Sequence, residues 1–146
     1  MWVVIVSCVL LVAVTTLIHY EVLRTLQAGL PKLRIPVRTK VVVVMFGIFF
    51  AHTAEIAIYA ISLFVLMHNF DVGNLTGTSA TTFLDCVHFS SETYTSLGLG
   101  DIAPTGPVRI FAGVEALNGL LLIAWSASFT YLSMEKFWGN ARDGRK

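Results

Sequence analysis

A chain of 146 residues is at most one domain by length, and its makeup differs from that of soluble globular proteins. Hydrophobic residues make up 55% of the chain and charged residues only 13%, against about 25% charged residues in a typical soluble chain. The high hydrophobic content and the low charged content point to a membrane protein. The formal net charge of +1 gives no sign of a nucleic-acid partner.

The first apolar stretch covers residues 1–18 and is interrupted only by Ser7, Thr15 and Thr16. As a helix it would be about 27 Å long, which is enough to cross a thin hydrocarbon core. A cleaved signal peptide is the alternative, but such a peptide needs a basic start, whereas this chain opens with Met-Trp-Val-Val. We therefore expect residues 1–40 to form a retained transmembrane helix followed by a basic cytoplasmic loop.

A second and longer apolar stretch, residues 41–67, carries a stripe of polar side chains. His52, Glu55, Tyr59 and Ser62 follow one another at spacings of three and four, which places them on one face of a helix. Such a stripe would be costly against lipid, so we expect it to face protein. Two interpretations remain open: a gate sensitive to protons or metal ions, or an interhelical hydrogen-bond network.

The long connection at residues 68–106 contains more than coil. Its first part, "HNFDVGNLTGTS", is rich in turn-forming residues. Thr82 and Asp85 then form a capping box, which predicts a helix from about residue 80 to Tyr94. This helix is too short to cross a membrane, and a glycine-rich turn follows it. Together they predict a re-entrant hairpin, which survives at membrane depth only if it lines water or is covered by protein.

The glycine-rich turn "TSLGLGDIAP", residues 95–104, also satisfies the G-x-G-x-x-[GA] pattern of dinucleotide-binding proteins. That pattern requires a strand before the first glycine, here Gly98, and a helix directly after the turn. Here a capped helix precedes the turn, and Pro104 and Pro107 interrupt the residues where the second helix would have to begin. The four histidines match neither zinc spacing nor a catalytic triad. We therefore expect neither an enzyme nor a cofactor.

The third apolar stretch covers residues 107–138 and begins at a proline, which is favoured in the first turn of a helix. Gly119 lies near its middle, where glycine can serve as a hinge or can allow close packing of helices, and both interpretations remain open. Counting depth at about 1.5 Å per residue along the antiparallel second and third spans pairs Glu55 with Asn118 and Tyr59 with Glu115.

Orientation follows from the basic residues. Nine of the ten lie either between the first two spans or after the third, and three crossings place both groups on one side. The positive-inside rule makes that side cytoplasmic, so we expect an external N-terminus, a cell-membrane location and a short basic cytoplasmic tail at 139–146. The nine basic residues are Arg24, Lys32, Arg34, Arg38, Lys40, Lys136, Arg142, Arg145 and Lys146.

The segment "SSETYTSLGLGD", residues 90–101, resembles the pore helix and selectivity filter of the potassium channel superfamily, whose consensus is T-x-T-T-V-G-Y-G-D. It is similar to prokaryotic two-helix channels and to the pore domains of two-pore channels. The resemblance continues through "DIAPTGPVRIFAGVEALNG" and so covers about residues 80–135. It leaves the first span outside the two-helix pattern.

This resemblance implies an all-α membrane protein in which residues 41–138 form the pore domain, with an outer helix at 41–67, a filter at 95–101 and an inner helix at 107–138. One chain supplies one filter segment, so a closed ring needs several chains, most simply a homotetramer surrounded by lipid. Potassium ions would be bound by filter carbonyls only, and no other metal is expected. The implied ion-binding residues are Ser96, Leu97, Gly98, Leu99 and Gly100.

Two further features of the filter are implied. The side chains of Leu97 and Leu99 point away from the ion path into a surrounding wall, and Glu92 of the pore helix shares a proton with Asp101 behind the filter. Three residues depart from the consensus: Ser96 stands for Thr, Leu97 for Val and Leu99 for Tyr or Phe. The expected function is a potassium-selective channel, with a nonselective monovalent cation channel and a non-conducting accessory subunit as alternatives.

Overall fold

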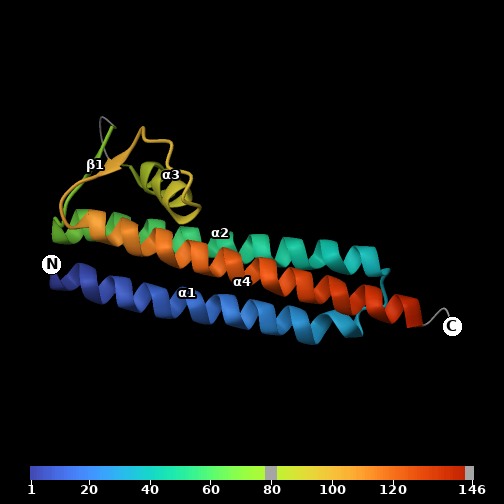
Figure 1. Ribbon diagram of the computed structural model, residues 1–146. Coiled ribbons are helices and arrows are strands. Elements are labelled where there is room, and N and C mark those ends of the chain that lie inside the picture. Colours follow the sequence, from blue (N-terminus) through green and yellow to red (C-terminus); the bar gives the residue numbers. More distant parts are fainter. Residues whose placement is uncertain (78–81, 144–146) are drawn as a thin grey trace.

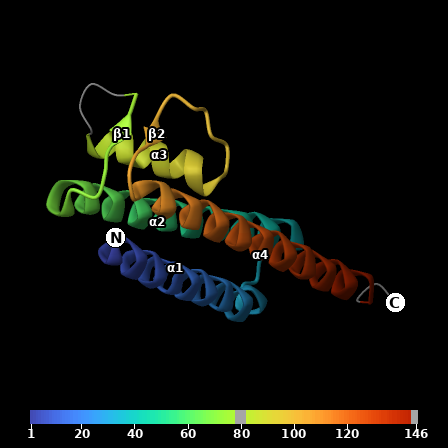
Figure 2. The same cartoon turned by 60° about the vertical axis from the view of Figure 1, so that its left-hand side comes forward.

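The computed structural model describes residues 1–77 and 82–143 and is built from long helices (Figure 1). Three of these helices lie side by side along their length, and a short helix with two short strands covers one end of the bundle (Figures 1 and 2). The elements are α1 (Trp2–Gly29), η1 (Leu30–Lys32), α2 (Val37–Phe70), β1 (Leu75–Thr76), α3 (Phe83–Tyr94), β2 (Ala103–Pro104) and α4 (Val108–Asp143).

The three long helices are each long and apolar enough to cross a membrane, over Trp2–Lys32, Val37–Phe70 and Val108–Lys136. The predicted all-α membrane fold is therefore confirmed. The first helix continues well past residue 18 because the following residues are good helix formers, and it ends only where Gly29 and Pro31 occur. The second begins directly after Pro36, four residues earlier than the apolar stretch.

The first helix is an integral part of the bundle. Its buried residues recur every three or four positions and form one stripe, which packs between α2 and α4. Two of the buried residues in this stripe, Thr15 and His19, are polar and need hydrogen-bond partners on the other helices. The complete stripe is Val4, Cys8, Leu11, Thr15, His19 and Leu23.

The start of α3 confirms the predicted capping box. The Asp85 N–H donates to the Thr82 hydroxyl at 3.3 Å, and the Thr82 N–H donates to the Asp85 carboxylate at 2.7 Å. These hydrogen bonds from Thr82 hold the pKa of the Asp85 carboxyl below its usual value. The helix itself begins at Phe83; residues 80 and 81, which were expected to belong to it, lie outside the described residues.

A two-stranded ladder joins the segment before α3 to the segment after the glycine-rich turn. Leu75 pairs with Pro104 and Thr76 with Ala103 in antiparallel register. The approach is close, because a Cβ atom on Gly77, whose φ is +102°, would lie 1.9 Å from a backbone oxygen. The sequence predicted only coil here. The ladder closes the segment between Thr76 and Ala103, which contains α3 and most of the glycine-rich turn, into one loop.

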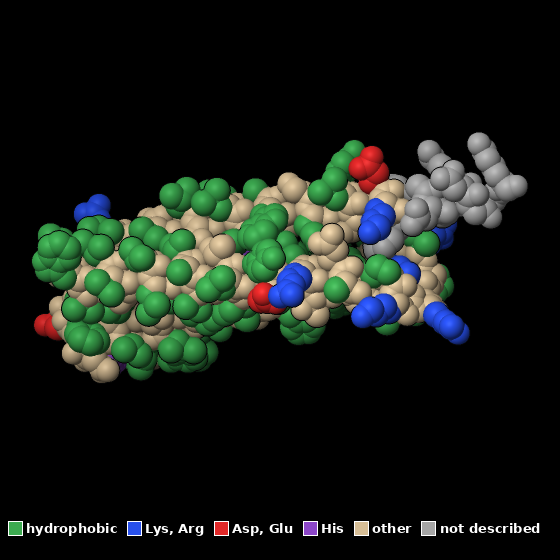
Figure 3. Space-filling model, turned by 90° about the horizontal axis from the view of Figure 1, so that it is seen from below, with side chains coloured by type: hydrophobic (Ala, Val, Ile, Leu, Met, Phe, Trp, Pro, Cys, Tyr) green, Lys and Arg blue, Asp and Glu red, His purple; other side chains and the backbone are tan. Residues whose placement is uncertain are grey.

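The surface of the bundle shows the expected division of charge. In Figure 3, hydrophobic side chains cover much of the visible face, and most of the visible Lys and Arg side chains gather toward the end away from the N-terminus. Figure 1 places the connection between α1 and α2 and the C-terminal end of α4 together at that end. Among the described residues, Lys136 of α4 and the basic residues that connect α1 and α2 therefore lie toward one end of the bundle.

Candidate ion-conducting site

The glycine-rich turn begins as a helix cap. The N–H of Leu97 donates to the carbonyl of Glu92 at 2.9 Å, and the N–H of Ser96 donates to that of Thr93 at 3.0 Å. These two bonds form a Schellman motif in which Ser96, with a φ of +57°, occupies the left-handed position that glycine usually takes. The end of α3 therefore fixes the direction in which the turn leaves it.

From Ser96 to Gly100, residues with a positive φ angle alternate with residues whose φ angle is not positive. Ser96, Gly98 and Gly100 have φ values of +57°, +56° and +83°, whereas the leucines between them do not have positive φ. A Cβ atom on Gly98 or Gly100 would meet nothing within 4 Å, so the glycines are needed for their backbone conformation and not for space. Alternating hand can turn successive carbonyl groups toward the same side, which is the arrangement a cation needs to replace its hydration shell.

The whole turn is exposed, from Thr95 to Asp101. Leu97 is 67% exposed and Leu99 is 64% exposed. The expectation that these two side chains lie within a wall is therefore not met by the described residues of one chain.

Behind the turn, Glu92, His88 and Asp101 lie together. Glu92 is largely buried, and its carboxylate accepts the N–H of Leu99 at 3.3 Å. The Nε2 atom of His88 lies 2.8 Å from Glu92 Oε1 and 3.3 Å from Asp101 Oδ2. The His88 imidazole thus lies within ion-pair distance of both carboxyl groups. The proton that Glu92 and Asp101 were expected to share stays a prediction.

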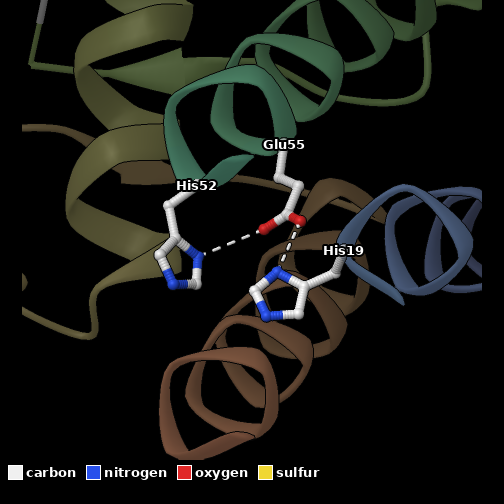
Figure 4. Close-up of side chains that lie close together, drawn as sticks. All are labelled: His19, His52 and Glu55. Atoms are coloured by element: carbon white, nitrogen blue, oxygen red, sulfur yellow. Dashed lines mark hydrogen bonds and ion pairs between the residues drawn. The ribbon is translucent and has the colours of Figure 1, made fainter. Parts of the chain in front are cut away.

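A second polar cluster is buried in the bundle beneath α3. The two oxygens of the Glu55 carboxylate lie 2.9 Å from Nδ1 of His19 and 3.2 Å from Nδ1 of His52, so that α1 and α2 meet at this carboxylate (Figure 4). The Tyr94 hydroxyl, from the last residue of α3, donates to Glu55 and lies 2.9 Å from His52 Nδ1. Ser126 of α4 lies 3.0 Å from His19 Nε2 and 3.1 Å from His52 Nε2.

One turn further along the bundle, Asn118 of α4 joins the same helices. Its amide donates to the Thr15 hydroxyl at 2.8 Å and to the Tyr59 hydroxyl at 3.0 Å. Asn118 therefore bonds to Tyr59, one helical turn away from its predicted partner Glu55. The predicted neighbours Tyr59 and Glu115 lie close enough to interact electrostatically. The polar face of α2 does contact the polar residues of α4, as predicted. The prediction considered only these two helices and therefore missed the partners that α1 supplies.

Glu115 and Gly119 both face α3. Glu115 is completely buried beside Ser90 of α3. A Cβ atom on Gly119 would lie 2.1 Å from the carbonyl oxygen of Tyr94, so glycine here allows α4 to contact the end of α3 directly. Of the two interpretations of Gly119, this geometry supports close packing.

Four of the sequence-predicted residues therefore belong to two separate clusters near the C-terminal end of α3. Glu92 and Asp101 lie beside the glycine-rich turn, and His52 and Glu55 lie beneath Tyr94. Sequence reasoning missed His88 and His19. His88 could have been found, because it precedes Glu92 by four residues on a helix and so shares its face. His19 could not, because the helix that carries it was expected to end at residue 18.

Comparison with known families supports a channel. The family model described as "Ion channel" matches residues 41–135, nearly two thirds of the chain. No curated protein and no solved structure matches the chain. The matched residues cover almost all of α2, all of α3 and the glycine-rich turn, and most of α4, and they leave α1 outside. The chain therefore belongs to the ion channel family, within the potassium channel superfamily that its pore segment resembles.

Proposed function

We propose that four copies of this chain assemble into a potassium-selective channel in the cell membrane, with the N-terminus outside and the C-terminus in the cytoplasm. The observation that carries this proposal is the backbone of residues 96–100. It alternates in hand at the end of a capped helix and is exposed along its whole length. Its carbonyl groups are the proposed ligands for potassium ions.

The need for several copies follows from the incompleteness of one chain. A single turn supplies one side of an ion path, and a ring of carbonyl groups requires rotational symmetry. The exposed Leu97 and Leu99 side chains support the same conclusion, because neighbouring copies would bury them. In this proposal the wall behind each filter segment is built partly by the adjacent chains.

Selectivity requires that the filter be held in shape. Leu99 lacks the phenol or ring found at this position in the family consensus, so it cannot make a hydrogen bond behind the filter. Glu92 supplies one instead, by accepting the Leu99 N–H, and His88 connects that carboxylate to Asp101. We infer that this bracing keeps the filter selective. A nonselective monovalent cation channel is the alternative that the loss of the phenol favours.

The proposal is tested with the purified full chain in liposomes. We expect potassium and rubidium to enter much faster than sodium under matched gradients. Equal rates for sodium and potassium would favour the nonselective channel, and no flux of either ion would favour the non-conducting accessory subunit.

A matched pair of glycine variants separates filter conformation from general damage. Gly98→Ala should abolish flux because its φ of +56° is strained for any residue with a Cβ atom. Gly29→Ala is the control, since a Cβ atom there also meets nothing within 4 Å but the residue lies in the helix α1. Flux that survives Gly98→Ala would contradict the assignment of the filter.

A further inference from the structure

The buried cluster beneath α3 forms a closed ring of hydrogen-bonding groups that joins all four α-helices. Glu55 contacts His19 and His52, both imidazoles contact Ser126, and Tyr94 bonds to Glu55. We propose that this ring is a proton-binding site. It holds one proton more than a carboxylate and two neutral imidazoles would hold, and that proton ties α1 to the end of α3.

The hydrogen-bond inventory favours one additional proton. If both imidazoles were neutral with their Nδ1–H groups directed at Glu55 and Tyr94, both Nε2 atoms would be acceptors. These two acceptors face the single hydroxyl of Ser126, at 3.0 and 3.1 Å, and that hydroxyl has only one proton to donate. With one more proton, one imidazole donates to Ser126 while Ser126 donates to the other. Placing the proton on Glu55 and reversing one tautomer gives the same total.

The charge of the site leads to the same number independently. His19 and Glu55 are completely buried, Ser126 is 5% exposed, and the His52 side chain is 17% exposed. A buried site is stable when its charges cancel. The Glu55 carboxylate with one imidazolium is neutral, whereas losing the proton leaves a net negative charge and gaining a second one leaves a net positive charge.

Other titratable groups surround the ring on each packed element. Tyr94 faces it from α3, and Tyr59 of α2 and Glu115 of α4 lie in the next layers toward α3. Cys8 of α1 lies beside Glu115. None of these groups supplies the missing proton, because Tyr94 already donates its own to Glu55 and the others belong to the neighbouring layers.

The ring matters for the pore because of where Tyr94 is placed. Tyr94 is the last residue of α3, and Ser96, where the backbone first changes hand, follows two residues later. Release of the proton would break one bond of the ring and leave an uncompensated carboxylate against the Tyr94 hydroxyl. We expect the end of α3 to loosen in that state, so that conduction depends on proton occupancy. The proton count itself does not depend on the proposed channel function.

The first test counts protons and does not require conduction. The full chain, labelled with ¹⁵N-histidine in lipid nanodiscs, reports which imidazole nitrogens are protonated, and infrared spectroscopy reports a protonated Glu55. We expect three protons near neutral pH over the four imidazole nitrogens of His19 and His52 and the Glu55 carboxyl. Glu55→Gln should reduce that number to two. Two or four protons in the unmodified protein would overturn the proposal.

Two further variants serve as a second perturbation of the ring and as a control. Ser126→Ala removes the hydroxyl shared by the two Nε2 atoms and should also release the additional proton, with a smaller change in packing than the loss of an imidazole. His68→Gln is the matched control, because His68 is exposed and bonds to the carbonyl of Phe64, away from the ring. It should leave the count at three. Two histidines and a glutamate also suit zinc, so one retained equivalent of zinc that His19→Gln removes would overturn the proton assignment.

The second test concerns the link to the pore and rests on the proposed function. Liposome flux is measured over a pH series for the unmodified chain, Ser126→Ala and His68→Gln. We expect Ser126→Ala to lose the pH dependence that His68→Gln retains. An identical pH dependence in all three proteins would overturn the coupling between the ring and α3. If the unmodified protein passes no ions, the proposed channel function is wrong. The proton count then still tests whether the ring binds the additional proton.

Discussion

Adding one methyl group at Gly119 would show how tightly α4 supports the filter. The new Cβ atom would lie 2.1 Å from the carbonyl oxygen of Tyr94 and 2.9 Å from its carbonyl carbon. Because Cβ contacts below 3.0 Å essentially never occur, the two backbones must separate by about 0.9 Å. The obstacle is backbone, which cannot rotate away as a flexible side chain would. Overpacking of this kind costs about 1–3 kcal/mol.

The free energy of unfolding of Gly119→Ala can be measured by denaturant titration in detergent micelles, alongside flux in liposomes. Gly113→Ala is the matched control in the same helix, because a Cβ atom there meets nothing within 4 Å. We expect Gly119→Ala to lose stability and flux, and Gly113→Ala to gain about 0.5–1 kcal/mol from the removal of a helical glycine. Equal stability changes of the same sign in the two variants would refute the close contact between α4 and the end of α3.

Three other variants test separate parts of the structure. Asn118→Ala leaves two buried hydroxyl groups without their donor and should cost about 1–3 kcal/mol in the same unfolding assay; no loss would contradict the interhelical bonds. Asp85 has a lowered pKa because it accepts bonds from Thr82, so its contribution to stability is complete above the ordinary value of 3.8 and is lost as pH falls through the lowered value. Asp85→Asn should remove that part of the acid sensitivity, and a pH series of unfolding that is unchanged would refute the cap. Glu92→Ala should alter open-state lifetime and its pH dependence in single-channel recordings while assembly persists, and unaltered gating would exclude the bracing role.

Local features of the fold could be predicted from the sequence. The three spans are visible as apolar stretches, and the start of α3 is visible in the capping pair of Thr82 and Asp85. Each depends on neighbouring residues only. The short ladder at Leu75 and Ala103 could not be predicted, because its two-residue strands carry no alternation and their pairing depends on contacts about thirty residues apart.

The polar partners inside the bundle were predicted only in part. The stripe containing His52 and Glu55 was correctly placed against protein, because its spacing identifies one helix face. Its partners depend on how far one helix slides along another, which sequence periodicity does not determine. Asn118 bonds to Tyr59 of α2 and also to Thr15 of α1. His19 belongs to a helix that continues beyond its apolar stretch, so its role required the structure.

The central claim is that the backbone of residues 96–100 forms a potassium-selective filter. It is tested most directly by the reversal potential of the reconstituted full chain with potassium on one side of a bilayer and sodium on the other. The account predicts a reversal potential strongly displaced in the direction set by potassium. A value near zero, with currents carried equally by both ions, would contradict it.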